Sequence, residues 1–494
     1  MRLETLRLRN FRGYEDREFK LHPEFNLVVG ENGAGKTSFL EAAAVAIGAW
    51  LLGIGGHDSR NIREHDVRVV RELIEKRYRE LPQYPVRIDA TGTIHAARVV
   101  RNTETGALEY GVRRAPSPEK TYPWDTAVRW GRSLDGQGGR TTRARAKSLT
   151  DLSQQMVRSV FKQDALVLPL IRYFSAGRLW ELVRDTDKRA LSKHKGKQPA
   201  ELAADADELD KALFDFEKLS EPFYGYRMSV DGRCNQRDMI RWMAFERRNE
   251  LDEDEESPAL RLVYRAIESL LPEIESASYN VKLGTLLLHH GDGQRLTFSE
   301  LSDGYRNVVT IAADLAIKAA MLNPQLAERA LELTPGVVLI DELDLHLHPK
   351  WQRRIIKDLR RTFPMIQFIC TTHSPQLIGQ AKADEIIVLD VQTPDQQGAV
   401  MVATTADAQH TDHPAQSFGM DSNWVLRHIM GSEDRDPGVA SKLDAIFEHI
   451  EEARFDLAQQ AVDDLRSSIG EHPELVEAQA LISRYTRFGE AAAE

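Results

Sequence analysis

The segment 30–37 constrains the fold of this 494-residue chain more than any other part of it. It reads Gly-Glu-Asn-Gly-Ala-Gly-Lys-Thr and matches the phosphate-binding pattern GxxxxGK[ST] in full. Apolar residues 25–29 precede it as an expected strand, and an expected apolar helix runs from Ser38 to about Leu52. Glycines permit a tight loop whose backbone N–H groups surround phosphates, and the helix adds its positive N-terminal end. This strand–loop–helix unit predicts an α/β fold with a nucleotide site.

The loop contains side chains that suit a nucleotide and its metal ion. Lys36 is expected to reach the β- and γ-phosphates, and the hydroxyl of Thr37 is expected to bind Mg²⁺. A glycine-rich turn without a ligand is the alternative, which the flanking strand and helix disfavour. The predicted nucleotide-binding residues are Asn32, Gly33, Ala34, Gly35, Lys36, Thr37 and Ser38.

The composition excludes several classes of protein. With 42% hydrophobic and 29% charged residues, the chain is neither fibrous nor disordered throughout. Cys234 and Cys370 are too few for a disulfide framework. No secretory signal and no run of about 20 apolar residues is present, so we expect a cytoplasmic protein with no membrane partner. At a net charge of −11, any contact with nucleic acid must come from local basic patches.

Two downstream strands are followed by groups suited to catalysis. The apolar segment 337–340 leads into Asp341, expected to hold Mg²⁺ through its water shell, and Glu342, expected to polarise the attacking water as a general base. The apolar segment 367–371 leads to His373, expected to donate a hydrogen bond to the γ-phosphate. Taken singly, these patterns also fit surface acids and a solvated loop histidine. The predicted catalytic residues are Lys36, Asp341, Glu342 and His373.

The segment 301–306, Leu-Ser-Asp-Gly-Tyr-Arg, precedes an apolar helix that extends through Ala320. Ser302 is a suitable N-cap residue, and Gly304 lets the backbone come close to a large group. By itself this is an ordinary capping motif. Its functional meaning depends on its place in the order of the motifs.

That order resembles the order in ABC-type ATPase heads. The P-loop comes first, followed by the Ser-x-Gly helix, the Asp-Glu strand with Asp344 just after it, and the strand before His373. The resemblance implies ATP as the nucleotide and Mg²⁺ as its cofactor. It also implies that Asp344 belongs to the loop, here called the D-loop, that communicates across a subunit interface.

The same resemblance implies a head-to-tail dimer, or a higher even-numbered oligomer, that sandwiches two ATP molecules. Ser302, Asp303 and Gly304 of one subunit, the signature segment, would then close on the γ-phosphate held by Lys36 of the other.

We expect a P-loop NTPase fold of the α/β class, an ABC-type head with an inserted helical subdomain and an all-helical C-terminal tail. The expected domains are an N-terminal lobe of the head with the P-loop (1–182), the inserted helical subdomain (183–275), a C-terminal lobe with the other motifs (276–416) and a helical partner-docking region (417–494).

Finer features resemble the DNA-acting branch of these heads. The start 6–13, Leu-Arg-Leu-Arg-Asn-Phe-Arg-Gly, and the signature are similar to RecF, SMC and overcoming-lysogenization (OLD) ATPases. The segments 173–180, 345–352 and 417–423 are most similar to the PtuA ATPase of Septu anti-phage defence and of Septu-associated retrons. That resemblance implies an ATPase that assembles with a separate HNH-type nuclease and controls it. It leaves DNA or retron-derived nucleic acid open as a further partner.

One element of transporter heads is missing. Those heads carry a glutamine loop, whereas the corresponding segment 173–180 contains no glutamine. Arg178 is the candidate substitute for the water-positioning role of that glutamine.

The chain lacks the signals of a nuclease. After residue 390 it shows no clustered carboxylates of the kind a Toprim nuclease uses to hold metal, and no Cys/His cluster has zinc-ligand spacing. We therefore expect an ATPase that cuts nothing itself. A glycine- and arginine-rich loop, 131–147, is a candidate for phosphate contacts and equally a solvated basic loop. Its candidate cations are Arg140, Arg143, Arg145 and Lys147.

Two other functions remain open at this point. One is a DNA-repair or DNA-end-sensing ATPase similar to RecF or SMC. The other is an ATP-gated scaffold whose turnover is incidental.

Overall fold

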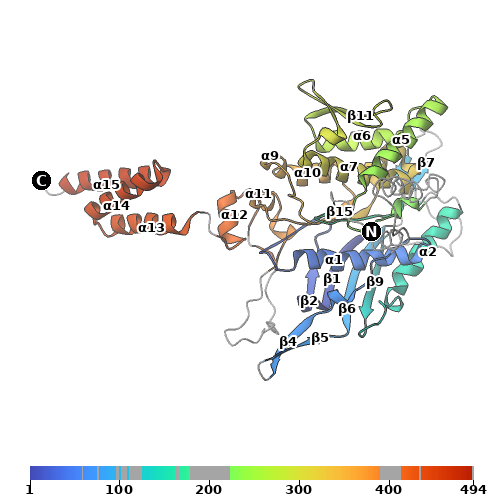
Figure 1. Ribbon diagram of the computed structural model, residues 1–494, viewed down its shortest axis with the longest axis horizontal. Helices are drawn as coiled ribbons and strands as arrows, with labels where there is room; N and C mark the ends of the chain where they lie inside the picture. The colour runs from blue at the N-terminus through green and yellow to red at the C-terminus, as the bar shows by residue number, and fades with distance from the viewer. Residues whose placement is uncertain are drawn as a thin grey trace, which may run out of the picture. The chain divides into compact units, whose positions relative to one another are not determined.

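The computed structural model divides into two compact units, Met1–Met420 and Asp421–Glu494 (Figure 1). The domain boundaries expected at 182, 275 and 416 stay predictions, and residues 183–222 of the expected helical insertion lie outside the described residues. The structure describes residues 1–57, 59–74, 77–95, 99–101, 108–110, 125–162, 166–178, 223–389, 413–414, 416–432 and 435–491.

A five-stranded parallel sheet organises the first unit. Its strand order is β10-β14-β15-β3-β16, and each neighbouring pair is parallel. All residues of β10, β14 and β15 are buried, as expected for apolar strands covered on both faces. The α/β fold expected from the sequence is thereby confirmed. The strands are β3 (Phe25–Gly30), β10 (Leu170–Phe174), β14 (Gly336–Ile340), β15 (Ile366–Thr371) and β16 (Ile386–Leu389).

Helix α1 (Lys36–Ile47) lies between this sheet and a second one. It begins two residues earlier than expected and continues as a 3₁₀ helix, Gly48–Gly53. The helix contacts β14 and β15 on one side and, on the other, β6 (Val86–His95) and β9 (Asp125–Leu134) of the second sheet. Because it is covered on both sides, its sequence after Glu41 is apolar on all faces.

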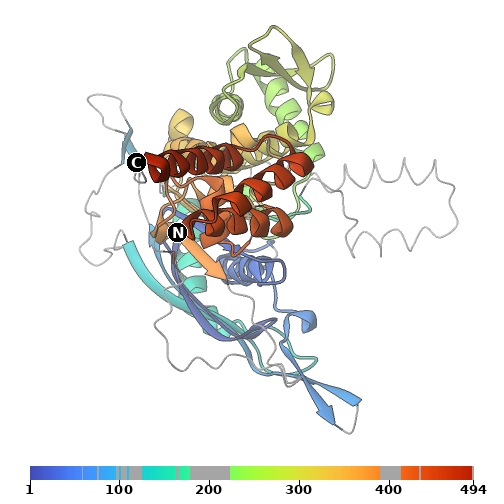
Figure 2. The ribbon, with the colours of Figure 1, turned by 90° about the vertical axis from the view of Figure 1, so that its left-hand side faces the viewer.

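The second sheet is antiparallel, with strand order β2-β1-β6-β9 (Figure 1). Its long blue and teal strands are visible in the lower part of Figure 2. Two hairpins, β4 with β5 and β7 with β8, add to this part of the chain. The strands are β1 (Arg2–Phe11), β2 (Tyr14–Lys20), β4 (Val69–Ile74), β5 (Arg77–Pro82), β6 (Val86–His95), β7 (Val99–Arg101), β8 (Leu108–Tyr110) and β9 (Asp125–Leu134).

The glycine- and arginine-rich loop is shorter than predicted. Residues up to Leu134 continue β9, and Lys147 already begins helix α2 (Lys147–Phe161). The pattern misled because Arg132 points inward, where it is fully buried and donates hydrogen bonds to the Thr142 carbonyl and the Ser59 hydroxyl. Burial lowers the pKa of Arg132 to about 10.

Helices and a small sheet occupy the next part of the first unit. Helices α5 (Gln236–Glu253) and α6 (Pro258–Leu270) are helical as expected, and α6 packs against α7 (Asp303–Leu322). The chain between α6 and α7 forms a three-stranded antiparallel sheet of β11 (Ile274–Asn280), β12 (Thr285–His290) and β13 (Arg295–Thr297). The short helices are α8 (Ala330–Leu333), α9 (Pro349–Gln352), α10 (Ile355–Thr362) and α11 (Pro375–Ile378).

The second unit is helical, which confirms the expected tail. It consists of α12 (Ser422–His428), α13 (Pro437–Glu451), α14 (Phe455–Ile469) and α15 (Pro473–Ala491). Its core is entirely apolar. The core residues are Leu443, Ile446, Ile450, Ala458, Val462, Leu465, Leu475, Ala478 and Ile482.

In no described helix of either unit is there a stretch apolar and long enough to cross a membrane.

Candidate nucleotide site

The loop between β3 and α1 has a backbone suited to an anion. Gly33 and Gly35 have φ angles of 88° and 97°, which glycine adopts at low cost. Gly35 is the N-cap of α1 and no side chain caps this helix. The N–H groups of the first turn are therefore left for a ligand such as phosphate. A Cβ on Gly35 would lie 2.9 Å from the hydroxyl oxygen of Tyr14, which donates to the Gly35 carbonyl at 3.1 Å.

Lys36 is the first residue of α1, and its side chain reaches back to this loop. Its Nζ donates to the carbonyl oxygens of Gly30 and Glu31, both at 2.8 Å. Burial lowers the pKa of Lys36, and the negative charges of Asp341 and Glu342 act in the opposite direction. An ammonium group held over a glycine-rich loop suits a phosphate. The contact of Lys36 with a nucleotide stays a prediction.

Thr37 and Asp341 are 304 residues apart in the sequence and meet beside the ends of β3 and β14. Thr37 Oγ1 lies 3.0 Å from Asp341 Oδ2, and Thr371 Oγ1, at the end of β15, donates to Asp341 Oδ1 at 2.6 Å. They meet because parallel strands end at the same edge of the sheet. A hydroxyl beside a buried carboxylate offers the oxygen ligands that Mg²⁺ takes. The two residues predicted as metal ligands therefore fit that ion.

The remaining predicted groups share one hydrogen-bond network. The backbone N–H of Glu342, a residue with a φ of 50°, donates to Thr371 Oγ1 at 2.8 Å. Asp344 Oδ1 accepts from the Thr372 hydroxyl at 2.6 Å and from the His373 N–H at 3.4 Å. The segments after β14 and β15 are thus bound together, and Asp344 lies beside the backbone of His373.

The signature segment is placed at the start of α7. Ser302 is the N-cap residue, as predicted, although its side chain accepts no capping hydrogen bond. Gly304 makes its close approach within the chain, since a Cβ there would lie 2.5 Å from the His346 carbonyl oxygen. Ser302 and Asp303 are exposed. Within the described residues, no hydrogen bond or ion pair joins 302–304 to the loop 30–37.

Arg178 does not take the place of a water-positioning glutamine, and that expectation is wrong. Its side chain is fully buried beneath the end of β14. Nη1 donates to the Asp341 carbonyl at 2.6 Å, Nη2 to the Glu342 carbonyl at 3.0 Å and Nε to Asn307 Oδ1 at 2.6 Å. Burial lowers the pKa of Arg178 to about 10.

A charged network beside the loop went unrecognised in the sequence. Glu41, on α1, forms ion pairs with Arg12 and with Arg60. Arg12 also donates to Asp66 at 2.9 Å, and its Nη1 lies 3.5 Å from the hydroxyl oxygen of Ser38. The segment 6–13 contains Arg12, but nothing in its pattern indicates partners so far along the chain.

The candidate cations for nucleic-acid contact differ in their surroundings. Arg145 forms an ion pair with Asp89, which reduces its availability to a phosphate. Arg140, Arg143 and Lys147 are exposed.

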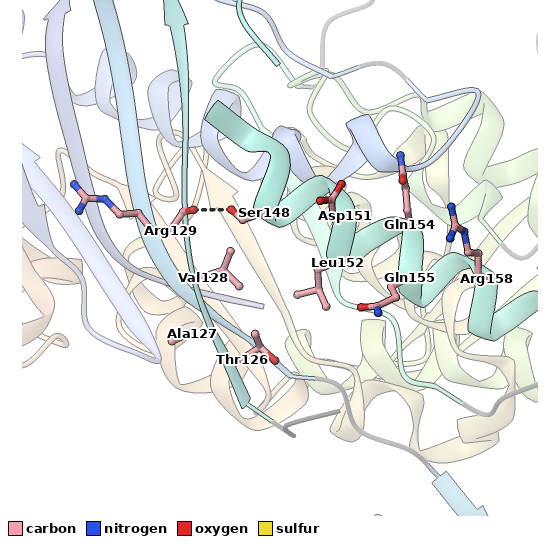
Figure 3. A pocket seen from close by; sticks show the side chains of 10 residues that line it. All are labelled: Thr126, Ala127, Val128, Arg129, Ser148, Asp151, Leu152, Gln154, Gln155 and Arg158. Carbon is pink, nitrogen blue, oxygen red and sulfur yellow. Dashed lines mark hydrogen bonds between the residues drawn. The ribbon is translucent and has the colours of Figure 1, made fainter. Parts of the chain in front are cut away.

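A groove of about 610 Å³ lies between β9 and α2 (Figure 3). At one end of the groove, the hydroxyl of Ser148 donates to the Arg129 carbonyl at 2.6 Å (Figure 3). No residue of the predicted nucleotide site lines this groove.

Comparison with known families defines the class of protein. The family described as "AAA domain" matches residues 5–275, more than half of the chain. A second description, "AAA domain, putative AbiEii toxin, Type IV TA system", matches residues 192–379. The chain belongs to the AAA domain family, which makes it a probable ATPase and implies that it binds ATP.

Individual relatives confirm the resemblance expected from the motifs. "Retron Ec83 probable ATPase" of Escherichia coli is 25% identical over 460 residues, 88% of this chain and 77% of that protein. "Retron Vc95 probable ATPase" of Vibrio cholerae is 26% identical over 255 residues, 46% of this chain and 48% of that protein. "Septu protein PtuA" of Bacillus mycoides is 40% identical over 90 residues, 18% of this chain and 12% of that protein. The chain thus aligns with about half of the Vibrio protein and a small part of the Septu protein.

Among solved structures, the SMC head bound to the C-winged helix domain of ScpA aligns with a TM-score of 0.40 and 16% identity. The alignment covers 78% of this chain and 94% of that one.

Proposed function

We propose that two copies of this chain hydrolyse ATP between them as the ATPase subunit of an anti-phage defence complex. The observation that carries the proposal is the meeting of Thr37 with Asp341, next to Lys36 and Glu342. Mg²⁺ bound by Thr37 and Asp341 would neutralise phosphate charge. In this proposal Lys36 holds the β- and γ-phosphates, Glu342 accepts a proton from the attacking water, and His373 donates to the γ-phosphate.

The signature segment supports a dimer. Ser302 is exposed, its hydroxyl is not used as a cap, and no described hydrogen bond or ion pair joins it to the loop of its own chain. In a head-to-tail dimer this hydroxyl would meet the γ-phosphate on the second copy, and Asp344 would lie near the same interface.

The role of Glu342 is tested by Glu342→Gln, which keeps the size of the side chain and removes the base. We expect kcat to fall by about 10²- to 10⁴-fold while ATP still binds. The matched control is Glu300→Gln, at an exposed site outside the predicted catalytic set, and it should leave turnover unchanged. A wild-type rate for Glu342→Gln would show that the proposed reaction does not use this site.

The dimer is tested by mixing two inactive variants, Lys36→Ala and Ser302→Arg. Each alone lacks one half of every site, whereas a mixed dimer contains one intact site. At equal amounts, about a quarter of the wild-type turnover should return, because half of the dimers are mixed and each has one of two sites. No recovery, with mixed dimers shown to be present, would contradict a shared site.

The nuclease partner is proposed from the relatives, whose names refer to retrons and the Septu system. We propose that an HNH-type nuclease encoded beside this chain joins the complex and that residues 421–494 dock it. Removing 421–494 should then abolish co-purification of the nuclease and leave ATP turnover within about twofold. If Glu342→Gln stops turnover but preserves protection against phage, the scaffold alternative is correct. Repair genes as the only neighbours would favour the DNA-repair alternative.

A further inference from the structure

We propose that Arg178 and Asn307 are positioning residues. They orient the carboxylate of Glu342 and couple its orientation to the position of helix α7, which follows Ser302 of the signature segment. The inference rests on the proposed function, in which Glu342 is the general base. In this role the pair acts on the backbone around Glu342 and does not need to contact the nucleotide.

The first step is the conformation of Glu342. Its φ of 50° lies in the left-handed region, which residues other than glycine rarely adopt. In that region, as in a helix, successive carbonyl groups point in similar directions, whereas in a strand they alternate. One guanidinium therefore binds both carbonyls that flank Glu342: Arg178 donates to the Asp341 oxygen at 2.6 Å and to the Glu342 oxygen at 3.0 Å.

Holding the carbonyls before and after a residue restricts both of its backbone dihedral angles. The direction in which the Glu342 side chain leaves the backbone is thereby restricted too. The Thr371 hydroxyl adds a third restraint by accepting the Glu342 N–H at 2.8 Å. Arg178 thus acts on Glu342 through the backbone and not through its side chain.

The second step is the cost of burying Arg178. Its side chain is fully buried, and in the described part of the chain its hydrogen bonds go to neutral acceptors, three backbone carbonyls and the Asn307 amide oxygen. The nearby buried Arg172 instead pairs directly with Asp314 at 2.7 Å. A buried cation without a bonded carboxylate is expensive. Such a group is better explained by what it positions than by a contribution to stability.

The third step is the connection to α7. Asn307 lies one turn after Gly304 on this helix and is 1% exposed. It accepts from Arg178 Nε at 2.6 Å and donates from Nδ2 to the Leu345 carbonyl at 2.9 Å. Gly304 is packed against the His346 carbonyl. A displacement of α7, when its first turn engages a nucleotide, would therefore be passed to the segment that carries Glu342.

Arg178→Lys tests the proposal, because it keeps the charge but cannot hold two carbonyls with one planar group. We expect kcat to fall by about 10- to 100-fold, the size of effect that a small misplacement of a catalytic group produces. The KM for ATP and the affinity for a fluorescent ATP analogue should change by less than about threefold. Asn307→Ala, which keeps Arg178, should lower kcat less and also spare nucleotide affinity.

The matched control is Arg132→Lys, at an arginine that is equally buried but lies in β9 and has no bond to Glu342. It should lower the melting temperature without a selective loss of kcat. If Arg178→Lys and Asn307→Ala instead lose kcat, nucleotide affinity and folded fraction together, the pair is only structural and the proposal is wrong. Asn307→Ala decides the case if Arg178→Lys does not fold.

A double variant separates this inference from the proposed function. If Arg178 acts through Glu342, adding Arg178→Lys to Glu342→Gln should not lower the residual rate further. A further 10-fold loss would show that Arg178 acts by another route. A wild-type rate in Glu342→Gln overturns the proposed function, whereas an inactive Glu342→Gln with a fully active Arg178→Lys overturns this inference alone.

Discussion

The first unit, 1–420, and the second unit, 421–494, are built on opposite principles. In the first, polar side chains hundreds of residues apart converge at one edge of a parallel sheet, and charged groups such as Arg172 and Lys318 lie in the interior. In the second, the core between three consecutive helices is wholly apolar.

Their charges differ as well. Residues 1–420 contain 60 acidic and 58 basic side chains, whereas residues 421–494 contain 16 and 7. Of the net charge of −11, −9 therefore belongs to the second unit and −2 to the first. The predicted site of the first unit therefore depends on contacts between distant parts of the chain, whereas the second unit is acidic and forms its core from consecutive helices.

The largest effect should come from breaking the contact that most depends on topology. Thr37→Ala removes the hydroxyl beside Asp341 and should lower kcat/KM by about 100-fold and raise the Mg²⁺ concentration needed for half-maximal turnover. Thr37→Ser should keep most of the activity. In the second unit, Thr486→Ala removes a hydroxyl that bonds the Ile482 carbonyl and should leave turnover unchanged. Equal losses from Thr37→Ala and Thr486→Ala would contradict the comparison.

The next effect tests the apolar core of the second unit. Ile446 is fully buried there, and Ile446→Ala should destabilise the unit by about 2–5 kcal/mol through lost burial and a cavity. Hydrogen exchange should show the loss of protection in α13–α15 alone, with ATP turnover unchanged. Loss of protection in the parallel sheet would mean that the two units do not unfold separately.

A smaller effect tests the buried charge of the first unit. Lys318 Nζ donates to the Gly225 and Arg227 carbonyls, and burial lowers its pKa from the ordinary 10.5 to about 8. Between these two values the unfolded chain binds more protons than the folded one, so this group makes stability rise with pH from about 8 to 10.5.

Lys318→Met should remove that contribution. The denaturation midpoints of the wild type and of Lys318→Met are measured from pH 7.5 to 9, and the wild-type midpoint minus the variant midpoint should rise with pH. An unchanged difference across this range would show that Lys318 keeps its ordinary pKa. The apolar core of the second unit contains no ionisable side chain and should contribute no such slope.

The smallest effect concerns nucleic acid. If the first unit contacts DNA through its exposed loop, changing Arg140, Arg143 and Lys147 to Gln should flatten the salt dependence of binding by about two to three units. Arg145→Gln should change it less, because Arg145 is paired with Asp89. An unchanged slope in the triple variant would remove this loop from DNA binding.

Much of the fold could be predicted from local patterns. The phosphate-binding loop, the apolar strands ending near Asp341 and His373, and the helical tail each follow from short stretches of sequence. These succeed because glycine conformations, strand alternation and helix periodicity are properties of neighbouring residues. The order of the motifs then indicated which of them belong to one site.

Side-chain direction was decided only by the tertiary structure. The sequence pattern places Arg132 in a basic loop, but its side chain is buried. It makes Arg178 a candidate for positioning the attacking water, but this side chain binds the backbone around Glu342. Ser302 is the predicted N-cap, but its hydroxyl accepts no capping hydrogen bond. The sequence by itself determined which chemical groups the chain has and the local backbone that presents them. Where each group points depended on partners distant in sequence, because a buried polar atom takes the acceptor or donor that packing brings to it.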